Sequence, residues 1–140
     1  KKKDFDFGEG PLSSFPVTLP DLVTLHQATG VRDIETFVHV AAGAFPDGDA
    51  NELPAGPSSD EREANRYHAV VEVTDMDGSV ARSLLDTVNG YTFTAIAAAE
   101  AARRVLAGEV RPGFQTPAGL FGHGFAESIA DTRITDIPIS

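Results

Sequence analysis

The sequence contains no cysteine, no tryptophan and few basic residues. The absence of cysteine excludes disulfides, thiol nucleophiles and thiolate metal sites, and it fits a cytoplasmic protein. With 11 Lys and Arg against 21 Asp and Glu, the formal net charge is -10, which opposes binding to nucleic acid or to an anionic membrane surface. No apolar run reaches the roughly 18 residues of a membrane-spanning helix, and no signal-peptide core is present. We therefore expect a cytoplasmic protein with no nucleic-acid or membrane partner.

The length of 140 residues is that of one domain, so we expect a single domain over 1–140. Residues 1–4 are expected to be disordered or foreign to the native chain. Residues 43–64 contain repeated glycine, proline and acidic residues, a composition with little apolar surface to bury. This segment is therefore predicted to be a mobile acidic loop.

Strand-like and helix-like patterns are both present, without a regular alternation of the two. Asp75-Met76-Asp77-Gly78 has the composition of a hairpin turn between two strand-like runs. Pro20-Asp21 opens a helix that ends at Gly30. Together the patterns predict an α+β fold, a mixed, largely antiparallel sheet with helices packed mostly on one face. The expected strands are 15–19, 34–41, 66–74, 79–87 and 125–129, and the longest expected helix is 91–107.

The hairpin carries two charges on the face that we expect to be apolar. A loop of two or four residues places Arg82 and Asp86 on the face of the apolar residues of the first strand, Tyr67, Ala69, Val71 and Val73. A charge on such a face must be paired, reach an edge or meet a ligand. Solvated side chains at an edge and ligand binding both remain open for Arg82 and Asp86.

The long helix has defined ends. Thr92 can accept hydrogen bonds from the first-turn amides, and Gly108 stands where a left-handed residue would end the helix. One side of the helix is expected to pack against the sheet, with Glu100 exposed on the other side. The residues of the expected packing side are Ala95, Ala98, Ala99, Ala101, Ala102, Val105 and Leu106. Thr116-Pro117 then opens a short helix that ends at Gly122.

Four polar residues stand near the starts of these two helices, where an anion or a carbonyl oxygen is favoured. They are Tyr91, Thr92, Gln115 and Thr116. A simpler alternative remains open, in which the two threonines only cap their helices and Tyr91 packs. With Arg82 and Asp86, the four complete the set of candidate substrate-binding residues.

The order of several motifs resembles one family. The segment GYTFTAIAAAEAARRVLAGEVRPGFQTP at 90–117 is followed by LFG at 120–122, and preceded by FPVTLPDL at 15–22 and TGVRDIETFV at 29–38. Over most of 5–136 the chain resembles the C-terminal portion of bacterial saccharopine dehydrogenase-like NAD(P)-dependent oxidoreductases. The resemblance implies a domain for substrate binding and dimerisation, hence a small-molecule substrate and a homodimer.

The cofactor-binding part of that family has no counterpart in this sequence. Its Gly-x-Gly-x-x-Gly turn is absent, and Gly8-Glu9-Gly10 has no apolar strand before it and is expected to be a turn. We expect no cofactor on this chain, and NAD(P) is implied only if a Rossmann domain precedes it. No metal is expected, because the four histidines lack the spacing of a metal site.

Two other functions remain open. One is a stand-alone, cofactor-free isomerase or cyclase of specialised metabolism, in which Tyr91, His68 or Arg82 polarises a substrate carbonyl. The other is a non-enzymatic homodimeric module built on the Ala-rich helix. An upstream Gly-x-Gly-x-x-Gly turn in the natural reading frame would favour the oxidoreductase, and a start near residue 1 would favour the alternatives.

Overall fold

The computed structural model describes residues 1–41 and 56–138. The chain divides into two compact units, Lys1–Ser59 and Asp60–Ser140. The expectation of a single domain over 1–140 stays a prediction. Most of the acidic segment expected to be a loop lies outside the described residues, but its last part forms a helix, α2 (Ser59–Ala64). The expectation of a loop throughout 43–64 is therefore wrong for residues 59–64.

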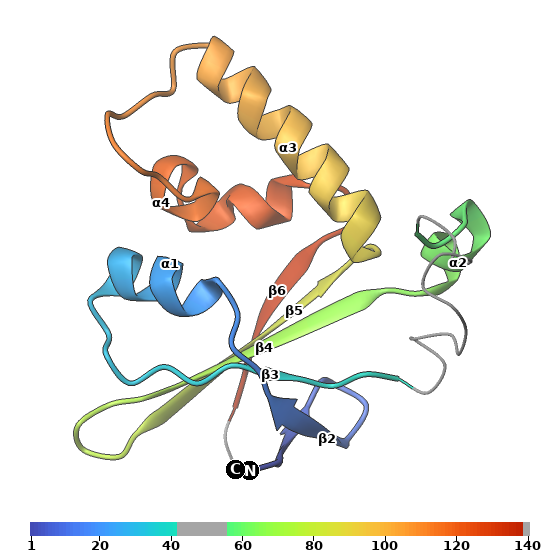
Figure 1. Ribbon diagram of the computed structural model, residues 1–140, viewed down its shortest axis with the longest axis vertical. Coiled ribbons are helices and arrows are strands. Elements are labelled where there is room, and N and C mark those ends of the chain that lie inside the picture. Colours follow the sequence, from blue (N-terminus) through green and yellow to red (C-terminus); the bar gives the residue numbers. More distant parts are fainter. Residues whose placement is uncertain (42–55, 139–140) are drawn as a thin grey trace. The chain divides into compact units, whose positions relative to one another are not determined.

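The first unit contains a small antiparallel sheet with strand order β1-β2-β3 (Figure 1). The carboxylate of Asp6 shapes the turn between the first two strands, accepting from the N–H groups of Gly8 at 2.8 Å and Gly10 at 3.0 Å. Helix α1 ends as predicted at Gly30, which has a left-handed φ of 75°. The elements are β1 (Lys3–Asp6), β2 (Pro11–Pro16), α1 (Asp21–Thr29) and β3 (Phe37–Val38).

Three expectations for the first unit differ from the structure. The strand expected over 15–19 lies earlier in the chain, at Pro11–Pro16. Lys3 and Asp4, expected to be disordered, pair with Ser14 and Ser13 in the first hairpin. The strand expected over 34–41 is only two residues long, because β3 pairs with β2 over Phe15 and Pro16 alone. The alternating pattern of this segment was therefore a weak guide to its pairing.

The second unit contains a second antiparallel sheet, with strand order β4-β5-β6. All strand pairings among the described residues are antiparallel, and strands and helices together make an α+β protein, as predicted. The strands form two sheets where one was expected. The elements after α2 are β4 (Tyr67–Thr74), β5 (Val80–Thr87), α3 (Gly90–Leu106), α4 (Pro117–Phe121), the 3-10 helix η1 (His123–Ser128) and β6 (Arg133–Ile137).

The turn between β4 and β5 corrects the predicted register. Asp75 donates its N–H to Ser79 O at 2.9 Å and accepts from the N–H of Gly78 at 3.2 Å, and Gly78 has a φ of 88°. This closes a three-residue loop with a glycine bulge, instead of the two or four residues expected. An odd loop pairs residues of the same parity, so Arg82 lies opposite Glu72 and Asp86 opposite His68.

The new register places the charged residues of the hairpin on one face. Arg82 and Asp86 share this face with His68, Val70 and Glu72, and not with Tyr67, Ala69, Val71 and Val73 as expected. The other face combines these four residues of β4 with the small and aliphatic residues of β5. Its members are Tyr67, Ala69, Val71, Val73, Ala81, Ser83, Leu85 and Thr87.

Helix α3 has the predicted C-terminal end and a different N-terminal cap. Asn89, which is buried, accepts from the N–H of Tyr91 at 3.1 Å, so the cap expected from Thr92 is supplied by Asn89. At the other end Gly108, with a φ of 97°, donates to Val105 O, and Glu109 donates to Arg104 O. This pair of bonds is a Schellman motif, which satisfies carbonyls that the helix itself leaves open.

The C-terminal segment supplies the core of the second unit. The strand expected over 125–129 is wrong, because this segment is mostly 3-10 helix and the strand lies further on, at Arg133–Ile137. Phe125 and Ile129 are four residues apart, a helical spacing, and they are the hydrophobic residues buried in the described part of the chain. The buried core is therefore small.

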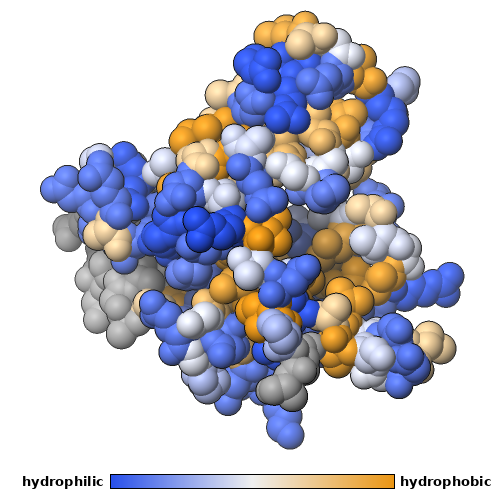
Figure 2. Space-filling view, turned by 180° about the vertical axis from the view of Figure 1, so that it is seen from behind, coloured by the Kyte–Doolittle hydropathy of each residue, from blue (hydrophilic) through white to orange (hydrophobic). Residues whose placement is uncertain are grey.

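Many large hydrophobic residues lie at the surface instead (Figure 2). They include Tyr67, Val71 and Val73 on β4, and Leu106 at the end of α3. Soluble monomers seldom expose large contiguous apolar patches, so this distribution favours association with other protein surface. Within residues 1–41 and 56–138, the helices are too short or too polar to cross a bilayer.

Candidate functional site

Arg82, a candidate for polarising a substrate carbonyl, is held by the opposite strand. Its guanidinium contacts one carboxylate oxygen of Glu72, with Nε at 2.9 Å and Nη2 at 2.6 Å. The two side chains are 25% and 20% exposed. Because this guanidinium is paired and half-buried, we assign it a structural role between the two strands and not a role in substrate binding.

Asp86 belongs to a cluster around Arg66, just before β4. Arg66 donates through Nε to Asp86 at 2.7 Å, and through its two terminal nitrogens to the Asp131 carboxylate at 3.0 Å and the Asp131 carbonyl at 2.8 Å. The hydrogen bond from Arg66 lowers the pKa of Asp86, against the opposing effect of desolvation. Arg66 thus ties the start of β4 to the end of β5 and to the turn before β6.

His68 lies on the same cluster, opposite Asp86. Its Nε2 is 3.3 Å from the Asp86 carboxylate, and its side chain is 35% exposed. A histidine beside a carboxylate is the arrangement of many general bases. Here the carboxylate is shared with Arg66, so the cluster first serves to join the strands.

The start of α3 presents one tyrosine hydroxyl to solvent. Tyr91 is 58% exposed, and its hydroxyl has no hydrogen-bond partner among the described residues. Thr92 follows it and is half-buried. Beside them the ring of Tyr67 covers Gly90 so closely that a Cβ added there would lie 2.5 Å from a ring carbon.

This helix start does not fit a dinucleotide phosphate. The first-turn N–H of Tyr91 already donates to the side chain of Asn89, and the ring of Tyr67 covers Gly90. A pyrophosphate cradle needs open glycine backbone and free amides at the helix start. We therefore place no cofactor chemistry on α3.

Gln115 and Thr116 hold the turn that leads into α4. Arg111 donates to Gln115 Oε1 and, at 2.7 Å, to Gly119 O, while Gln115 donates to Pro112 O at 3.3 Å. Thr116 caps α4 by accepting from the N–H of Gly119 at 3.1 Å. Both polar side chains therefore have structural roles in this turn.

The structure does not join the two predicted halves of the site. The hydrogen bonds of Gln115 and Thr116 are local, and no bond between described residues links them to Tyr91 or Thr92. Helix α3, which follows Tyr91 and ends before this turn, has 17 residues and is about 25 Å long. Convergence of the two pairs on one ligand stays a prediction.

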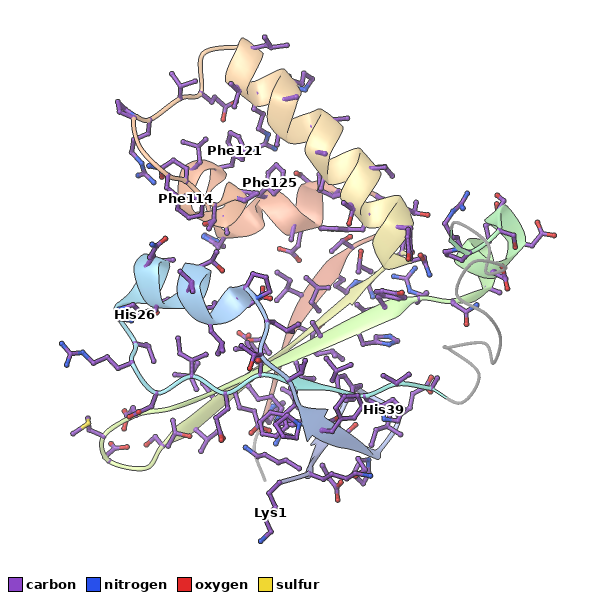
Figure 3. The ribbon with its side chains drawn as sticks, viewed as in Figure 1. Lys1, His26, His39, Phe114, Phe121 and Phe125 are labelled. Carbon is purple, nitrogen blue, oxygen red and sulfur yellow. The ribbon has the colours of Figure 1, made fainter. Side chains whose placement is uncertain are left out.

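A cluster around Arg104 was missed by the sequence reasoning. Its guanidinium lies over the rings of Phe121 at 5.4 Å and Phe125 at 5.2 Å, and these rings stack at 5.1 Å (Figure 3). It also bonds Glu100 at 2.8 Å and Ser128 at 3.2 Å. The covered side of α3 is therefore Phe93, Ala97, Glu100, Ala101 and Arg104. Of the expected packing side only Ala101 is covered, whereas Ala95, Ala98, Ala99, Ala102, Val105 and Leu106 are exposed.

The histidines of the first unit are structural, and no cluster of the described residues is suited to a metal. His26 Nδ1 is 2.7 Å from Val31 O, beside the end of α1, and His39 Nδ1 is 3.0 Å from Ser13 O on β2 (Figure 3). In each pair the histidine ring contacts a backbone carbonyl, which lies 5 residues away for His26 and 26 residues away for His39.

A shallow hollow lies in the first unit, where β2, α1 and the segment before β3 meet. Its volume is about 230 Å³, below the roughly 300 to 1,000 Å³ of typical small-molecule sites. None of the predicted site residues lines it. The residues that do line it form no motif from which a binding site could be predicted. The lining residues are Pro16, Val17, Thr18, Leu22, Ile34, Glu35 and Thr36.

Comparisons of the chain with protein-family models, with curated proteins and with solved structures found no match in any of the three.

Proposed function

We propose that this chain is the substrate-binding and dimerisation portion of a saccharopine dehydrogenase-like oxidoreductase that acts in the cytoplasm. The observation that carries the proposal is the segment 90–117, whose sequence resembles that family and whose residues have defined tasks in the fold. Gly108 ends the helix, Arg111 and Gln115 hold the turn, and Thr116 caps the next helix. These tasks explain why the segment needs these residue types, while the family itself is proposed from the order of the sequence motifs.

In such an enzyme a nicotinamide held by a preceding domain would supply the hydride chemistry. This chain would shape the substrate pocket and provide polar contacts. Arg82, Asp86, Gln115 and Thr116 are engaged within the protein. The exposed hydroxyl of Tyr91 is therefore the candidate that we propose as a donor to a substrate carbonyl or carboxylate.

A cofactor-free isomerase or cyclase receives less support. Two of its proposed catalytic groups have partners already, Glu72 for Arg82 and Asp86 for His68. The hollow described above is small and contains none of these residues. One observation favours the non-enzymatic module. On the exposed face of α3, small residues lie beside Val105 and Leu106 and could pack against another protein.

The natural gene and its product test the proposal. We expect the reading frame to extend upstream to a strand, a Gly-x-Gly-x-x-Gly turn and a helix, and the encoded protein to bind NADH or NADPH in a fluorescence titration. A reading frame that starts near residue 1 contradicts the proposal. So does an upstream segment without a dinucleotide turn whose protein binds neither nucleotide.

A further inference from the structure

Strand β4 is an eight-residue edge strand of the sheet in the second unit. The N–H and C=O groups of Asp75 point toward β5. Along an antiparallel strand, the backbone groups of successive residues point alternately to one neighbouring strand and to the other. Tyr67, Val71 and Val73 therefore bond toward β5, whereas the backbone groups of His68 and Val70 point outward. Such an edge is a template for pairing with a further strand.

We propose that the edge of β4 pairs with β4 of a second copy of this chain, antiparallel and centred on Val70. In this register His68 of each copy lies opposite Glu72 of the other, on one face of the joined sheet. A histidine and a carboxylate that face each other across two strands form a favourable polar pair.

The same register matches the exposed apolar residues on the other face. Tyr67 lies opposite Val73 of the second copy, and Ala69 lies opposite Val71. Tyr67, Val71 and Val73 are 48%, 52% and 54% exposed, and an aromatic residue beside a β-branched one is a favourable cross-strand pair. The two-fold relation makes each of these contacts twice, as a symmetric dimer interface requires.

The proposal deepens the dimerisation part of the proposed function and rests on that part alone. Dinucleotide binding by a longer natural protein is independent of it. If the β4 pairing is refuted while an upstream dinucleotide turn is found, only the pairing is overturned.

Disulfide trapping tests the register, because the chain has no native cysteine. In the proposed pairing the two Val70 Cα atoms are about 5.5 Å apart, within the range of a disulfide. The two Val71 positions are diagonal neighbours at about 7 to 8 Å, too far for a bridge. We expect the Val70→Cys variant, oxidised by glutathione disulfide, to run as a covalent dimer on a non-reducing gel, and the Val71→Cys variant to stay monomeric. A monomeric Val70→Cys variant, or equal cross-linking of both variants, overturns the proposal.

Charge substitutions provide a second measurement on the cysteine-free chain. His68→Glu places like charges opposite each other twice, and we expect the dimer dissociation constant to rise about tenfold in sedimentation equilibrium. Met76→Glu adds the same charge at the hairpin tip, outside the pairing, and should leave the constant unchanged. A native chain that is monomeric at all concentrations, or equal effects of the two variants with both folds intact by circular dichroism, refutes the pairing.

Discussion

Arg104 connects three parts of the second unit through one side chain. It bonds Glu100 on its own helix, lies over Phe121 and Phe125, and donates to Ser128. A planar guanidinium can stack on rings while its edge donates hydrogen bonds, which a lysine cannot do. The side of α3 that carries this residue is therefore the covered side, although an alanine-rich side was available.

Glu100 should make the stability of the protein depend on pH in the acid range. Hydrogen bonds from Arg103 and then Arg104 lower its pKa from 4.5 to about 2. A lowered folded-state pKa stabilises the fold above the unfolded-state value, and the contribution disappears as pH falls from about 4.5 through 2. We expect Glu100→Gln to lower the melting temperature at pH 6 and to have no effect near pH 2. A difference that is constant over this range would contradict the assignment.

Tyr91 offers the sharpest test of the proposed substrate contact. Tyr91→Phe removes only a hydroxyl that has no partner in the described structure, so the fold should be unaffected. A hydroxyl that donates to a substrate oxygen contributes about 1 to 3 kcal/mol, and we expect kcat/KM of the natural full-length enzyme to fall about tenfold or more. Tyr67→Phe, at the only other tyrosine of the chain, is the matched control. Unchanged kinetics in the Tyr91 variant would mean that the site lies elsewhere.

Helix α3 depends on a left-handed residue at its C-terminal end. An added Cβ at Gly108 meets no atom within 4 Å, so the cost of Gly108→Ala is conformational and comes from a φ of 97°. We expect a loss of about 1 kcal/mol in the free energy of unfolding, measured by urea denaturation.

Gly124 provides the control for this substitution, because its Cβ position is also open and its φ is not positive. Gly124→Ala should be neutral or slightly stabilising. Equal destabilisation by the two variants would show that the left-handed conformation at Gly108 is not the cause.

The hairpin shows how one loop residue changes the chemistry of a whole sheet. A loop of even length would leave Arg82 among Tyr67, Val71 and Val73, where it would need a ligand or an edge. The three-residue loop with Gly78 in the left-handed region places Arg82 opposite Glu72 instead. A candidate binding residue thereby became half of a cross-strand ion pair.

At the level of the whole chain, we expect no binding of NADH or NADPH. The start of the long helix is occupied by Asn89 and covered by Tyr67, so it has no place for a pyrophosphate. Isothermal titration calorimetry of the 140-residue chain should show no saturable heat with either nucleotide. Micromolar binding would contradict both this expectation and the assignment of cofactor binding to another part of the protein.

The exposed apolar surface of the chain favours association with other protein surface. Large hydrophobic side chains of both units are exposed, and the described buried core contains only Phe125 and Ile129. Burial of apolar area is the main favourable term in folding and association. Covering β4, and in a longer protein other parts of this surface, would therefore add stability that the chain alone lacks.

Local chemistry in the sequence was sufficient for the α+β class, the hairpin turn, and the helix ends at Gly30, Gly108 and Gly122, because backbone conformation at glycine and capping depend on near neighbours. The length of the hairpin loop is also local, because its hydrogen bonds join Asp75, Gly78 and Ser79, but one residue of difference moves every side chain of a strand to the opposite face. The covered side of α3 was decided by tertiary structure, because it depends on the rings of Phe121 and Phe125. The same is true of the contact between Asp86 and Arg66, which lies 20 residues away in the sequence. The candidate site residues could therefore be named from the sequence. The sequence could not show that most of them already bind other residues of the protein.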